Sequence, residues 1–203
     1  MLKPQAIECE GGSYFVGQNV QIHKDANIGP DSYLWDNTRV FKGVSIGAGC
    51  VIGAGVTLEN EVILGKMCKV QAGNTLYKGI IADDYVFFGP NATTTNDRNP
   101  RAFGPWQLAE TYFGMGASIG ANSTIIAGNS IGALSLVGAG AIVSRDVEPG
   151  TLVIGSPARF KGWVNVTGEV ISRNDDSPKE ILEMLRDPKK AIEEYIRMNN
   201  YEG

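Results

Sequence analysis

The sequence predicts an all-β fold in which short strands wind into a solenoid, and two observations carry this prediction. An apolar residue recurs every six positions, and 16 of the 20 positions in this frame are Val, Ile or Leu. The residue after it is Gly in ten of these hexads. A helix would need apolar spacing near 3.6, and a hairpin strand would alternate strictly. A period of six therefore indicates a flat strand, a corner and a further strand.

Residues 1–15 precede the frame and are expected to form a strand and a turn around Gly11-Gly12. From Val16 the frame runs without a break to Leu76. Three strands close a coil of about 18 residues, and successive coils stack about 4.8 Å apart. This pattern is the parallel β-helix of hexapeptide repeats. The glycine that ten of the hexads carry is expected to let the backbone turn where a side chain would obstruct it.

A coil of three hexads predicts a ladder on one interior corner, formed by Ser32, Cys50, Cys68 and Val86. The two cysteines are either a redox pair or small apolar side chains that fill the ladder, and we favour the second interpretation. Asn74 and Asn129 are also expected to point inward. Such an asparagine is either a catalytic amide or, more commonly, a side chain that hydrogen-bonds the backbone of the next coil.

The frame weakens through Ala82, Phe88 and Thr94 and resumes at Phe113, one residue out of phase. From Thr94 to Phe113 the chain advances 19 positions where the frame needs six, so thirteen positions are inserted. They predict a projecting loop at about 95–112. An insertion that leaves a solenoid intact on both sides commonly carries function.

The frame ends at Val143, and a turn follows at Glu148-Pro149-Gly150. Ser177-Pro178 has the pattern of a helix start, with Ser177 as the N-cap, and Asp187-Pro188 begins a second helix. We therefore expect a β-helix domain over residues 1–163 and a tail with two short helices over 164–203. The tail is expected to cover the last coil rather than to dock on a membrane or partner, because an open solenoid end exposes its core.

Composition narrows the functional classes. The 203 residues carry a net charge of −4 without a Lys/Arg cluster, which disfavours nucleic acid and anionic membrane as partners. The absence of a long apolar run and of an apolar segment after Met1 leads us to expect a soluble cytoplasmic protein without membrane insertion. Three dispersed cysteines and one histidine, His23, argue against a disulfide framework and a structural zinc site.

The hexad frame, the turn at 146–149 and the segment Gly155-Ser156-Pro157-Ala158-Arg159 resemble the hexapeptide-repeat acyltransferases. The resemblance covers about residues 16–163. It implies a left-handed parallel β-helix that works as a homotrimer, with acyl-CoA bound between subunits. The left hand follows from the resemblance alone, because parallel crossovers are in general right-handed.

Several segments resemble, more narrowly, the N-acetyltransferases that act on nucleotide-linked 3-amino sugars in bacterial surface-glycan synthesis, such as that of O-antigen. These segments are residues 83–93, Thr95-Asn96-Asp97-Arg98, Pro100-Arg101, residues 116–125 and Gly162-Trp163. The resemblance implies acetyl-CoA as co-substrate, a UDP- or dTDP-linked amino sugar as acceptor, and no metal. The chain departs from the pattern in two places: Lys78 replaces an acidic residue, and Gly114-Met115 replaces lysines.

Acetyl transfer to an amine needs a positioned amine, donors for the oxyanion and a destination for one proton. His23 lies four coils before the loop, roughly 20 Å away, and is therefore expected to be a surface residue rather than a base. A neutral amine needs no strong base, so the missing histidine favours an amine acceptor over a hydroxyl. Asn96 and Asp97 are the catalytic candidates, to orient the sugar and receive or fix the amine; the alternative is that they only cap a turn.

Further residues are candidates for binding, with ordinary surface roles as the alternative. Arg98 and Arg101 are suited to a pyrophosphate. The other substrate candidates are Tyr77, Lys78 and Asn91. By the resemblance, Arg159 and Lys161 contact the 3′-phosphate of CoA. Also by the resemblance, backbone groups at Ala117-Ser118 and Gly138-Ala139 contact its pantetheine arm.

Two other functions remain open at this point. One is an acyltransferase that acts on another amine or on a hydroxyl. The other is a non-catalytic β-helical scaffold, which predicts that Asn96 and Asp97 can be changed freely. A metal enzyme with three histidine ligands is excluded because the chain has a single histidine.

Overall fold

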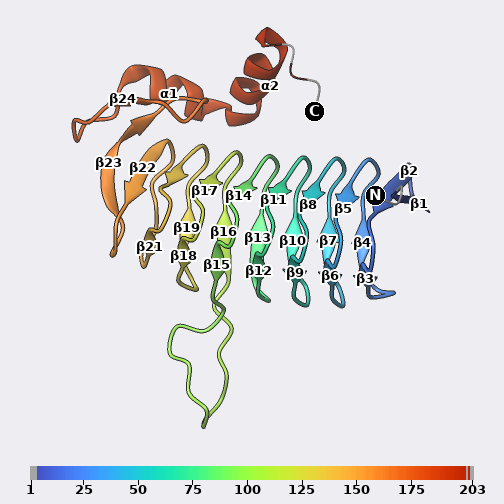
Figure 1. Cartoon of the computed structure of the whole chain (residues 1–203). Helices are drawn as coiled ribbons and strands as arrows, with labels where there is room; N and C mark the ends of the chain where they lie inside the picture. Colours follow the sequence, from blue (N-terminus) through green and yellow to red (C-terminus); the bar gives the residue numbers. More distant parts are fainter. Residues whose placement is uncertain (1–3, 200, 202–203) are drawn as a thin grey trace.

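The computed structural model describes residues 4–199 and 201, and it confirms a parallel β-solenoid with a projecting loop and a helical tail (Figure 1). The chain winds through three sheets. The eleven-stranded sheet contains β1 (Gln5–Cys9), β2 (Gly12–Val16), β5 (Tyr33–Leu34), β8 (Val51–Ile52), β11 (Lys69–Val70), β14 (Phe87–Phe88), β17 (Ser118–Ile119), β20 (Leu136–Val137), β22 (Thr151–Ile154), β23 (Arg159–Val164) and β24 (Val170–Ser172). The seven-stranded sheet contains β3 (Gln21–Ile22), β6 (Arg39–Val40), β9 (Thr57–Leu58), β12 (Thr75–Leu76), β15 (Thr93–Thr94), β18 (Thr124–Ile125) and β21 (Ile142–Val143). The six-stranded sheet contains β4 (Asn27–Ile28), β7 (Ser45–Ile46), β10 (Ile63–Leu64), β13 (Ile80–Ala82), β16 (Thr111–Phe113) and β19 (Ser130–Ile131).

Strand register confirms both the coil length and the insertion. Tyr33 pairs with Val51, which pairs with Lys69, so partners in adjacent coils lie 18 positions apart. Across the loop, Phe87 pairs with Ser118, and the partner numbers differ by 31 instead of 18. The thirteen inserted positions are therefore added to one coil without changing its neighbours.

At each corner, one position is constrained by its contact with the next coil and another by its backbone conformation. Gly47 directly follows a frame residue, and a Cβ there would lie 2.5 Å from the carbonyl carbon of Gly65 in the next coil. Its lack of a side chain thus lets adjacent coils approach each other. Two residues later the backbone adopts a left-handed φ, at Gly49 (69°) but also at Met67 (57°) and Leu134 (55°). The sequence did not reveal this second constraint, because non-glycine residues often occupy it.

The interior ladder lies where the period predicts. Ser32, Cys50, Cys68 and Val86 are fully buried. The Cys50 thiol donates to the carbonyl of Gly65, and the Cys68 thiol to that of Asp83, each at 3.1 Å. All cysteines of the described chain are free. Hydrogen bonding to Cys50, together with burial, raises the pKa of the Cys68 thiol. These thiols fill the core, as expected.

The weak part of the frame has a packing explanation. Phe88 and Phe113 are fully buried and meet edge to face, with ring centroids 4.9 Å apart. Ala82 pairs with Phe113 from the coil below, and Thr94 is buried in the same coil as Phe88. Two large rings therefore require two small neighbours, because protein interiors are close-packed.

The two ends differ from the regular coils. At the start, the expected strand and turn are part of a hairpin, in which β1 and β2 pair antiparallel up to Cys9 and Gly12. At the other end, β23 turns back antiparallel to β22 and continues into β24.

The prediction that the helical tail covers the last coil is wrong. Helices α1 (Lys179–Arg186) and α2 (Pro188–Met198) instead run back beside the solenoid (Figure 1). Ile181 packs against Gly150, whereas Ile192 reaches back to Gly116. The apolar stripe of each helix thus covers a corner of the solenoid rather than its end.

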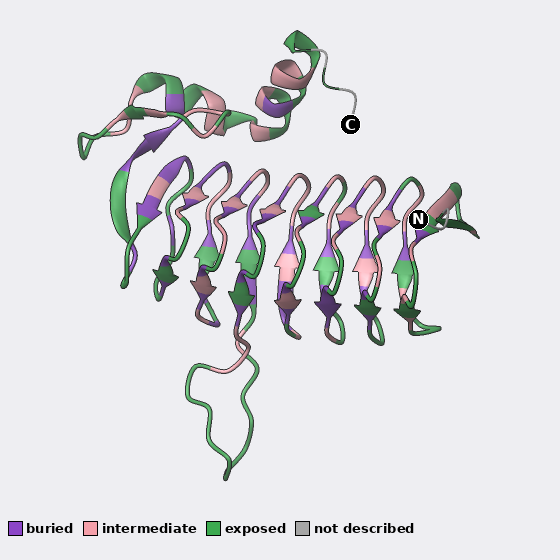
Figure 2. Cartoon of the chain, in the orientation of Figure 1, coloured by how far each residue is buried: buried purple, intermediate pink, exposed green. Residues whose placement is uncertain are grey.

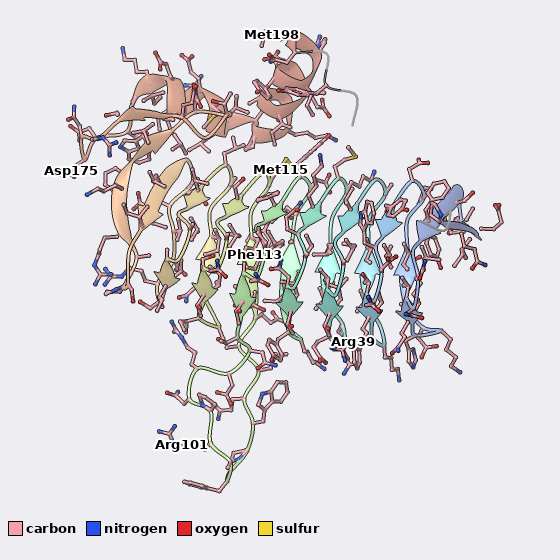
Figure 3. The ribbon with its side chains drawn as sticks, viewed as in Figure 1. Arg39, Arg101, Phe113, Met115, Asp175 and Met198 are labelled. Atoms are coloured by element: carbon pink, nitrogen blue, oxygen red, sulfur yellow. The ribbon has the colours of Figure 1, made fainter. Side chains whose placement is uncertain are left out.

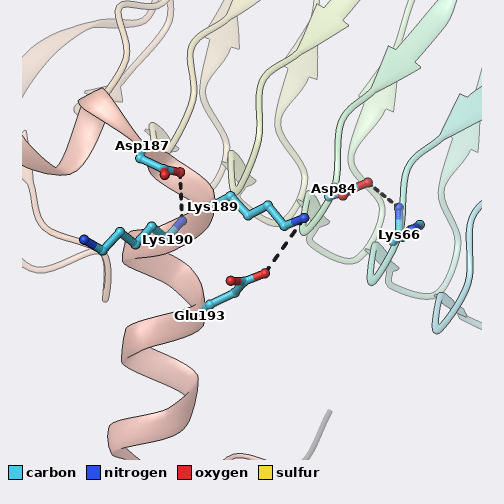
Figure 4. Close-up of polar contacts among 6 residues, drawn as sticks. All are labelled: Lys66, Asp84, Asp187, Lys189, Lys190 and Glu193. Carbon is cyan, nitrogen blue, oxygen red and sulfur yellow. Dashed lines mark hydrogen bonds and ion pairs between the residues drawn. The ribbon is translucent and has the colours of Figure 1, made fainter.

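Ser177 is not the N-cap of α1. Pro178 occupies the cap position in an extended conformation, with ψ 149°, and gives no side-chain hydrogen bond. The helix therefore starts one residue later than expected, and the Ser177 hydroxyl is buried without a partner in the described structure. The second prediction is confirmed, because Asp187 caps α2 by accepting from the Lys190 amide (Figure 4).

The three edges of the solenoid place the candidate residues, and we name them here. The loop edge joins the seven- and six-stranded sheets and includes residues 77–79, 95–110 and 126–129. The helix edge joins the six- and eleven-stranded sheets, and the bare edge joins the eleven- and seven-stranded sheets. The loop and the tail helices lie on opposite sides in Figure 1. No helix within the described residues is long and apolar enough to cross a membrane.

Candidate active site

The loop edge carries the two catalytic candidates at the base of the projecting loop. The loop leaves β15 at Thr94 and returns at β16. Its base is closed by a hydrogen bond from the Ala109 amide to the carbonyl of Asn96, at 3.0 Å. Residues 98–108 beyond this bond are exposed (Figure 2), whereas Asn96 and Asp97 are half-buried. The pair is therefore held where the loop meets the solenoid.

Asp97 has a structural contact as well as a free carboxylate oxygen. Its Oδ1 accepts from the Asn99 amide at 2.8 Å, which is the turn-capping role weighed above. Within the described chain, its Oδ2 and the side-chain amide of Asn96 form no hydrogen bond. These two groups are available to a bound acceptor.

Four further substrate candidates lie on the same edge. Tyr77 and Lys78 lie in the coil that precedes the loop in the sequence. Lys78 forms an ion pair with Glu61, at 2.8 Å. Arg98 donates from Nη2 to Oδ1 of Asn129 at 3.1 Å. Arg101 projects with the loop tip (Figure 3) and bonds only the neighbouring carbonyl of Pro100 within the described structure. Arg101 is thus the more accessible cation for a phosphate.

The cofactor candidates lie elsewhere on the solenoid. Ala117 is buried on the helix edge, its amide donates to Gly114 and its carbonyl accepts from Phe87, so it offers no free backbone group. Ser118 follows on the eleven-stranded sheet. Its amide donates to Ser135 at 2.9 Å, which leaves its hydroxyl to make contacts.

Gly138-Ala139 lies on the bare edge near the end of the stack. In lower coils the corresponding corner carbonyl accepts from the coil above, as Ala121 does from Gly140 at 2.8 Å. Within the described chain the Ala139 carbonyl has no such partner, so it is free to accept from a ligand amide. Asn91, a substrate candidate, also lies on the bare edge, where β15 separates it from Asn96 on the loop edge.

Arg159 and Lys161 lie on β23. Arg159 lines a cavity of about 380 Å³ at the end of the solenoid, together with Arg145, Phe160 and Trp163. The two rings pack edge to face, with centroids 5.5 Å apart. Asp146, Glu148 and Asp175 line the same cavity, so its two guanidiniums face three carboxylates and its charge does not favour a phosphate.

The structure therefore brings most of the catalytic and substrate candidates together on one edge and places the cofactor candidates elsewhere. Asn96, Asp97, Tyr77, Lys78, Arg98 and Arg101 share the loop edge. The cofactor candidates and Asn91 lie on the other two edges and on strands β17 and β23 of the eleven-stranded sheet. A single chain does not bring the two sets together.

An interaction on the six-stranded sheet was not found by sequence reasoning. The Tyr112 hydroxyl donates a short hydrogen bond to Asp83, one coil below. Partial burial, together with this bond and the charge of Asp83, raises the pKa of Tyr112 to about 12. Both line a cavity of about 540 Å³ that Arg186 and Lys189 border from the tail. Strand register could have found the pair, because Tyr112 pairs with Ile81 and Asp83 is on the same side of that strand.

His23 is on the surface, as expected. Its imidazole accepts from the Asp25 amide at 3.1 Å, and its side chain is 40% exposed. In the described chain, no group of three His, Cys, Asp or Glu side chains is arranged to hold a metal ion.

Comparison with known proteins identifies the repeat. Residues 25–60 match the model described as bacterial transferase hexapeptide (six repeats). Residues 114–145 match the model described as hexapeptide repeat of succinyl-transferase. Both matched stretches are parts of the solenoid. These matches lie on either side of the loop, so the inserted residues interrupt one array of hexapeptide repeats.

One curated relative is similar over a short stretch. It is the dTDP-3-amino-3,6-dideoxy-alpha-D-galactopyranose 3-N-acetyltransferase of Aneurinibacillus thermoaerophilus, 52% identical over 60 residues, which are 30% of this chain and 31% of the relative. The matches span less than a third of the length of the first curated relatives.

Two solved structures share the fold over most of the chain. AntD, an N-acyltransferase from Bacillus cereus in complex with dTDP and coenzyme A, aligns with a TM-score of 0.56 and 21% identity, over 87% of this chain and 90% of AntD. The polySia-specific acetyltransferase NeuO aligns with a TM-score of 0.51 and 17% identity, over 92% of this chain and 87% of NeuO. At these identities the likeness shows the fold alone.

Proposed function

We propose that the chain is an acetyl-CoA-dependent N-acetyltransferase that acts on the amino group of a nucleotide-linked amino sugar, with a 3-amino sugar as the first candidate. The observation that carries the proposal is the half-buried Asn96-Asp97 pair at the base of a loop inserted into transferase hexapeptide repeats. The relative named for a dTDP-3-amino sugar supports this acceptor class. A place in surface-glycan synthesis rests on the sequence resemblance.

The available groups suit attack by an amine. The amine nitrogen attacks the thioester carbonyl carbon, the C–S bond breaks, and the thiolate leaves. The attacking nitrogen loses one proton, and the thiolate takes one up, so the step is balanced. The Asn96 amide orients the sugar, and the free Oδ2 of Asp97 accepts from the amine or receives its proton. A neutral amine needs little basicity from this carboxylate.

The acceptor's diphosphate is assigned to Arg101, because the Arg98 guanidinium already donates to Asn129. Arg101 is exposed at the loop tip and bonds only a neighbouring carbonyl within the described chain. A guanidinium contacts phosphate oxygens bidentately. Lys78 adds a second cation one coil below, although its pairing with Glu61 offsets part of that charge. The CoA phosphates are assigned to Arg159 and Lys161.

The division of the site supports sites between copies of the chain, and that the copies form a homotrimer rests on the sequence resemblance. The loop-edge residues of one copy need the cofactor residues of another, because one chain holds them on different edges. The loop also exposes apolar surface, with Phe103 79% and Trp106 54% exposed. Exposed aromatic side chains of this kind suit burial against a second copy.

A thiol-release assay with acetyl-CoA and a panel of nucleotide-linked 3-amino and 4-amino sugars tests the proposal. We expect turnover on at least one 3-amino sugar. Asp97→Asn should lower kcat/KM by about 100-fold, as is typical when a catalytic proton acceptor is lost. Asn96→Ala should lower it about tenfold, the loss typical of one hydrogen bond to the acceptor. Matched controls on the same chain are Asn27→Ala and Asp25→Asn, both on exposed residues remote from the loop.

Two results would reject the proposal. The first is no turnover on any sugar together with no CoA binding by calorimetry, which favours a non-catalytic scaffold. The second is full activity of both the Asn96 and Asp97 variants, which removes the pair from the site. Turnover on a hydroxyl acceptor alone would assign the chain to the alternative class of acyltransferase.

A further inference from the structure

The corner at residues 126–129, in the coil above the loop, holds both stems of the loop. In an ordinary corner the third amide donates to a carbonyl one coil below, as Gly73 does to Ala54 at 3.1 Å. At this corner the Gly128 amide instead donates to the hydroxyl of Thr111, at 3.0 Å. The preceding amide, that of Ala127, donates to the hydroxyl of Thr95, at 2.8 Å. The two threonines thus tie the outgoing and returning stems to the same corner.

The last residue of this corner, Asn129, makes the third tie. Its side chain is 3% exposed. Its Nδ2 donates to the carbonyl of Ile126 at 2.6 Å, and its Oδ1 accepts from Nη2 of Arg98 at 3.1 Å. The hydrogen bond from Arg98 therefore connects the body of the solenoid to the residue that directly follows Asp97.

Asn74 is an inward asparagine at the equivalent corner position that has no arginine bonded to it. It has the same inward position in another corner, is fully buried, and donates to the carbonyl of Gln71 at the same 2.6 Å. Its Nδ2 also donates to the carbonyl of Gly89 in the next coil, at 2.9 Å. Its Oδ1 has no partner in the described structure. At Asn129 the corresponding oxygen is used to hold Arg98. The two asparagines therefore differ in the contact to the loop.

We infer that Asn129 is a positioning residue for the acetyl-transfer site, acting through Arg98 to fix the orientation of Asn96-Asp97. This inference rests on the proposed function. Arg98 follows Asp97 in the chain, so anchoring its guanidinium to the coil above limits rotation of the pair about the loop base. The hydrogen bond is charge-assisted, which makes it stronger than a neutral one. Arg98 is then an anchor of the loop, and Arg101 is the phosphate-binding arginine.

A double-mutant cycle on kcat and KM tests this inference. The variants are Asn129→Ser, Arg98→Met and the two combined, with Asn74→Ser as the control at an inward asparagine that has no contact to the loop. Serine keeps the backbone hydrogen bond of this corner position, as the Ser123 hydroxyl does to the Gly120 carbonyl at 2.7 Å. Asn129→Ser therefore removes the contact to Arg98, whereas Asn74→Ser removes the bond to Gly89. We expect each single variant to lower kcat about tenfold, the loss typical of a hydrogen bond to a charged group. The combined variant should be no slower than either single one, because both remove the same contact. Asn74→Ser should retain kcat.

The cycle also separates this role from direct phosphate binding by Arg98. Direct binding predicts that Arg98→Met raises KM for the nucleotide sugar while Asn129→Ser leaves KM and kcat unchanged. Effects of the two substitutions that multiply in the combined variant would likewise overturn the inference. An equal loss of kcat in Asn74→Ser would mean that the asparagines act only through folding, and would overturn it as well.

Amide hydrogen exchange gives a readout that does not need activity. The Ala109 amide closes the loop base, so its exchange should be about tenfold faster in Asn129→Ser and unchanged in Asn74→Ser. If the wild-type protein transfers no acetyl group, the proposed function fails and the catalytic part of this inference fails with it. Unchanged exchange at Ala109 in Asn129→Ser would overturn the anchoring contact itself, whatever the activity.

Discussion

Removing the loop should leave the solenoid folded and abolish acetyl transfer. Deleting residues 96–108 places Phe113 six positions after Thr94, which restores the frame. Glu110 then takes the corner position whose backbone is left-handed in other coils, as at Gly79, with φ 92°. The variant therefore also carries Glu110→Gly, since glycine adopts that conformation at little cost.

The structure allows the cost of the deletion to be estimated. Residues 98–108 are exposed, so little apolar burial is lost apart from the contact of Leu108 with Gly79. The largest loss is the partner of the buried Asn129 Oδ1, and an unpaired buried acceptor costs about 1–3 kcal/mol. Shortening the connection returns roughly 1 kcal/mol of loop-closure entropy. The net loss of at most about 2 kcal/mol corresponds to a fall in Tm of no more than about 8 °C for a chain of this size.

Circular dichroism and a thermal melt measure whether the shortened chain folds and how stable it is. Thiol release measures its activity. Glu110→Gly in the full-length chain is the control for the substitution. Loss of the β spectrum, or a fall in Tm above about 20 °C, would refute the interpretation that the loop is an insertion into a self-sufficient coil. Retained turnover in the shortened chain would refute the assignment of the site to the loop.

Three further predictions concern the solenoid. Gly47→Ala should destabilise by about 1–3 kcal/mol in a urea titration, because its Cβ would meet the Gly65 backbone at 2.5 Å; an unchanged midpoint would contradict this packing. Phe88→Ala should cost about 3–5 kcal/mol in the same assay, and a cost below about 1 kcal/mol would show that the ring is not a core residue. Tyr112 has a pKa of about 12 in the folded state and an ordinary value of 10 when unfolded, so its contribution to stability is present below pH 10 and is lost as the pH rises towards 12. The difference in 295 nm titration between the wild type and Tyr112→Phe measures it, and a midpoint that Asp83→Asn does not lower would exclude Asp83 as a cause.

The solenoid could be predicted closely because its constraints repeat. A residue at Val16 and its equivalents meets the same environment in every coil, so the period of six accumulates evidence that a single short strand would not give. The same repetition located the inserted loop and the Cys50–Cys68 ladder, since both follow from counting in whole coils.

The ends could not be predicted in this way, because nothing repeats there. Ser177-Pro178 has a helix-start pattern, but the extended conformation of Pro178 delays α1 by one residue. The helices could cover either the last coil or a neighbouring corner with the same apolar stripe. Only the turn back through β23 and β24 decides between these two arrangements.

The positions of the candidate residues were predicted in part. Motifs selected Asn96-Asp97 as candidates, and the frame placed Tyr77 and Lys78 in the preceding coil on the same edge. The anchoring of Arg98 was missed because its partner, Asn129, is distant in the sequence and has the same sequence signature as Asn74. A single sequence does not show which inward asparagine has an unused oxygen and which one has a cation within reach.

The central claim is that loop-edge residues of one copy and cofactor residues of another form one site, and complementation between two inactive variants tests it most directly. One variant carries Asp97→Asn, and the other carries Arg159→Ala with Lys161→Ala. Mixed oligomers formed by co-refolding should recover about a quarter of the wild-type activity, because one interface in four then combines an intact loop with an intact cofactor half. No recovery, from mixed oligomers whose formation is verified by mass spectrometry, would contradict a site shared between copies.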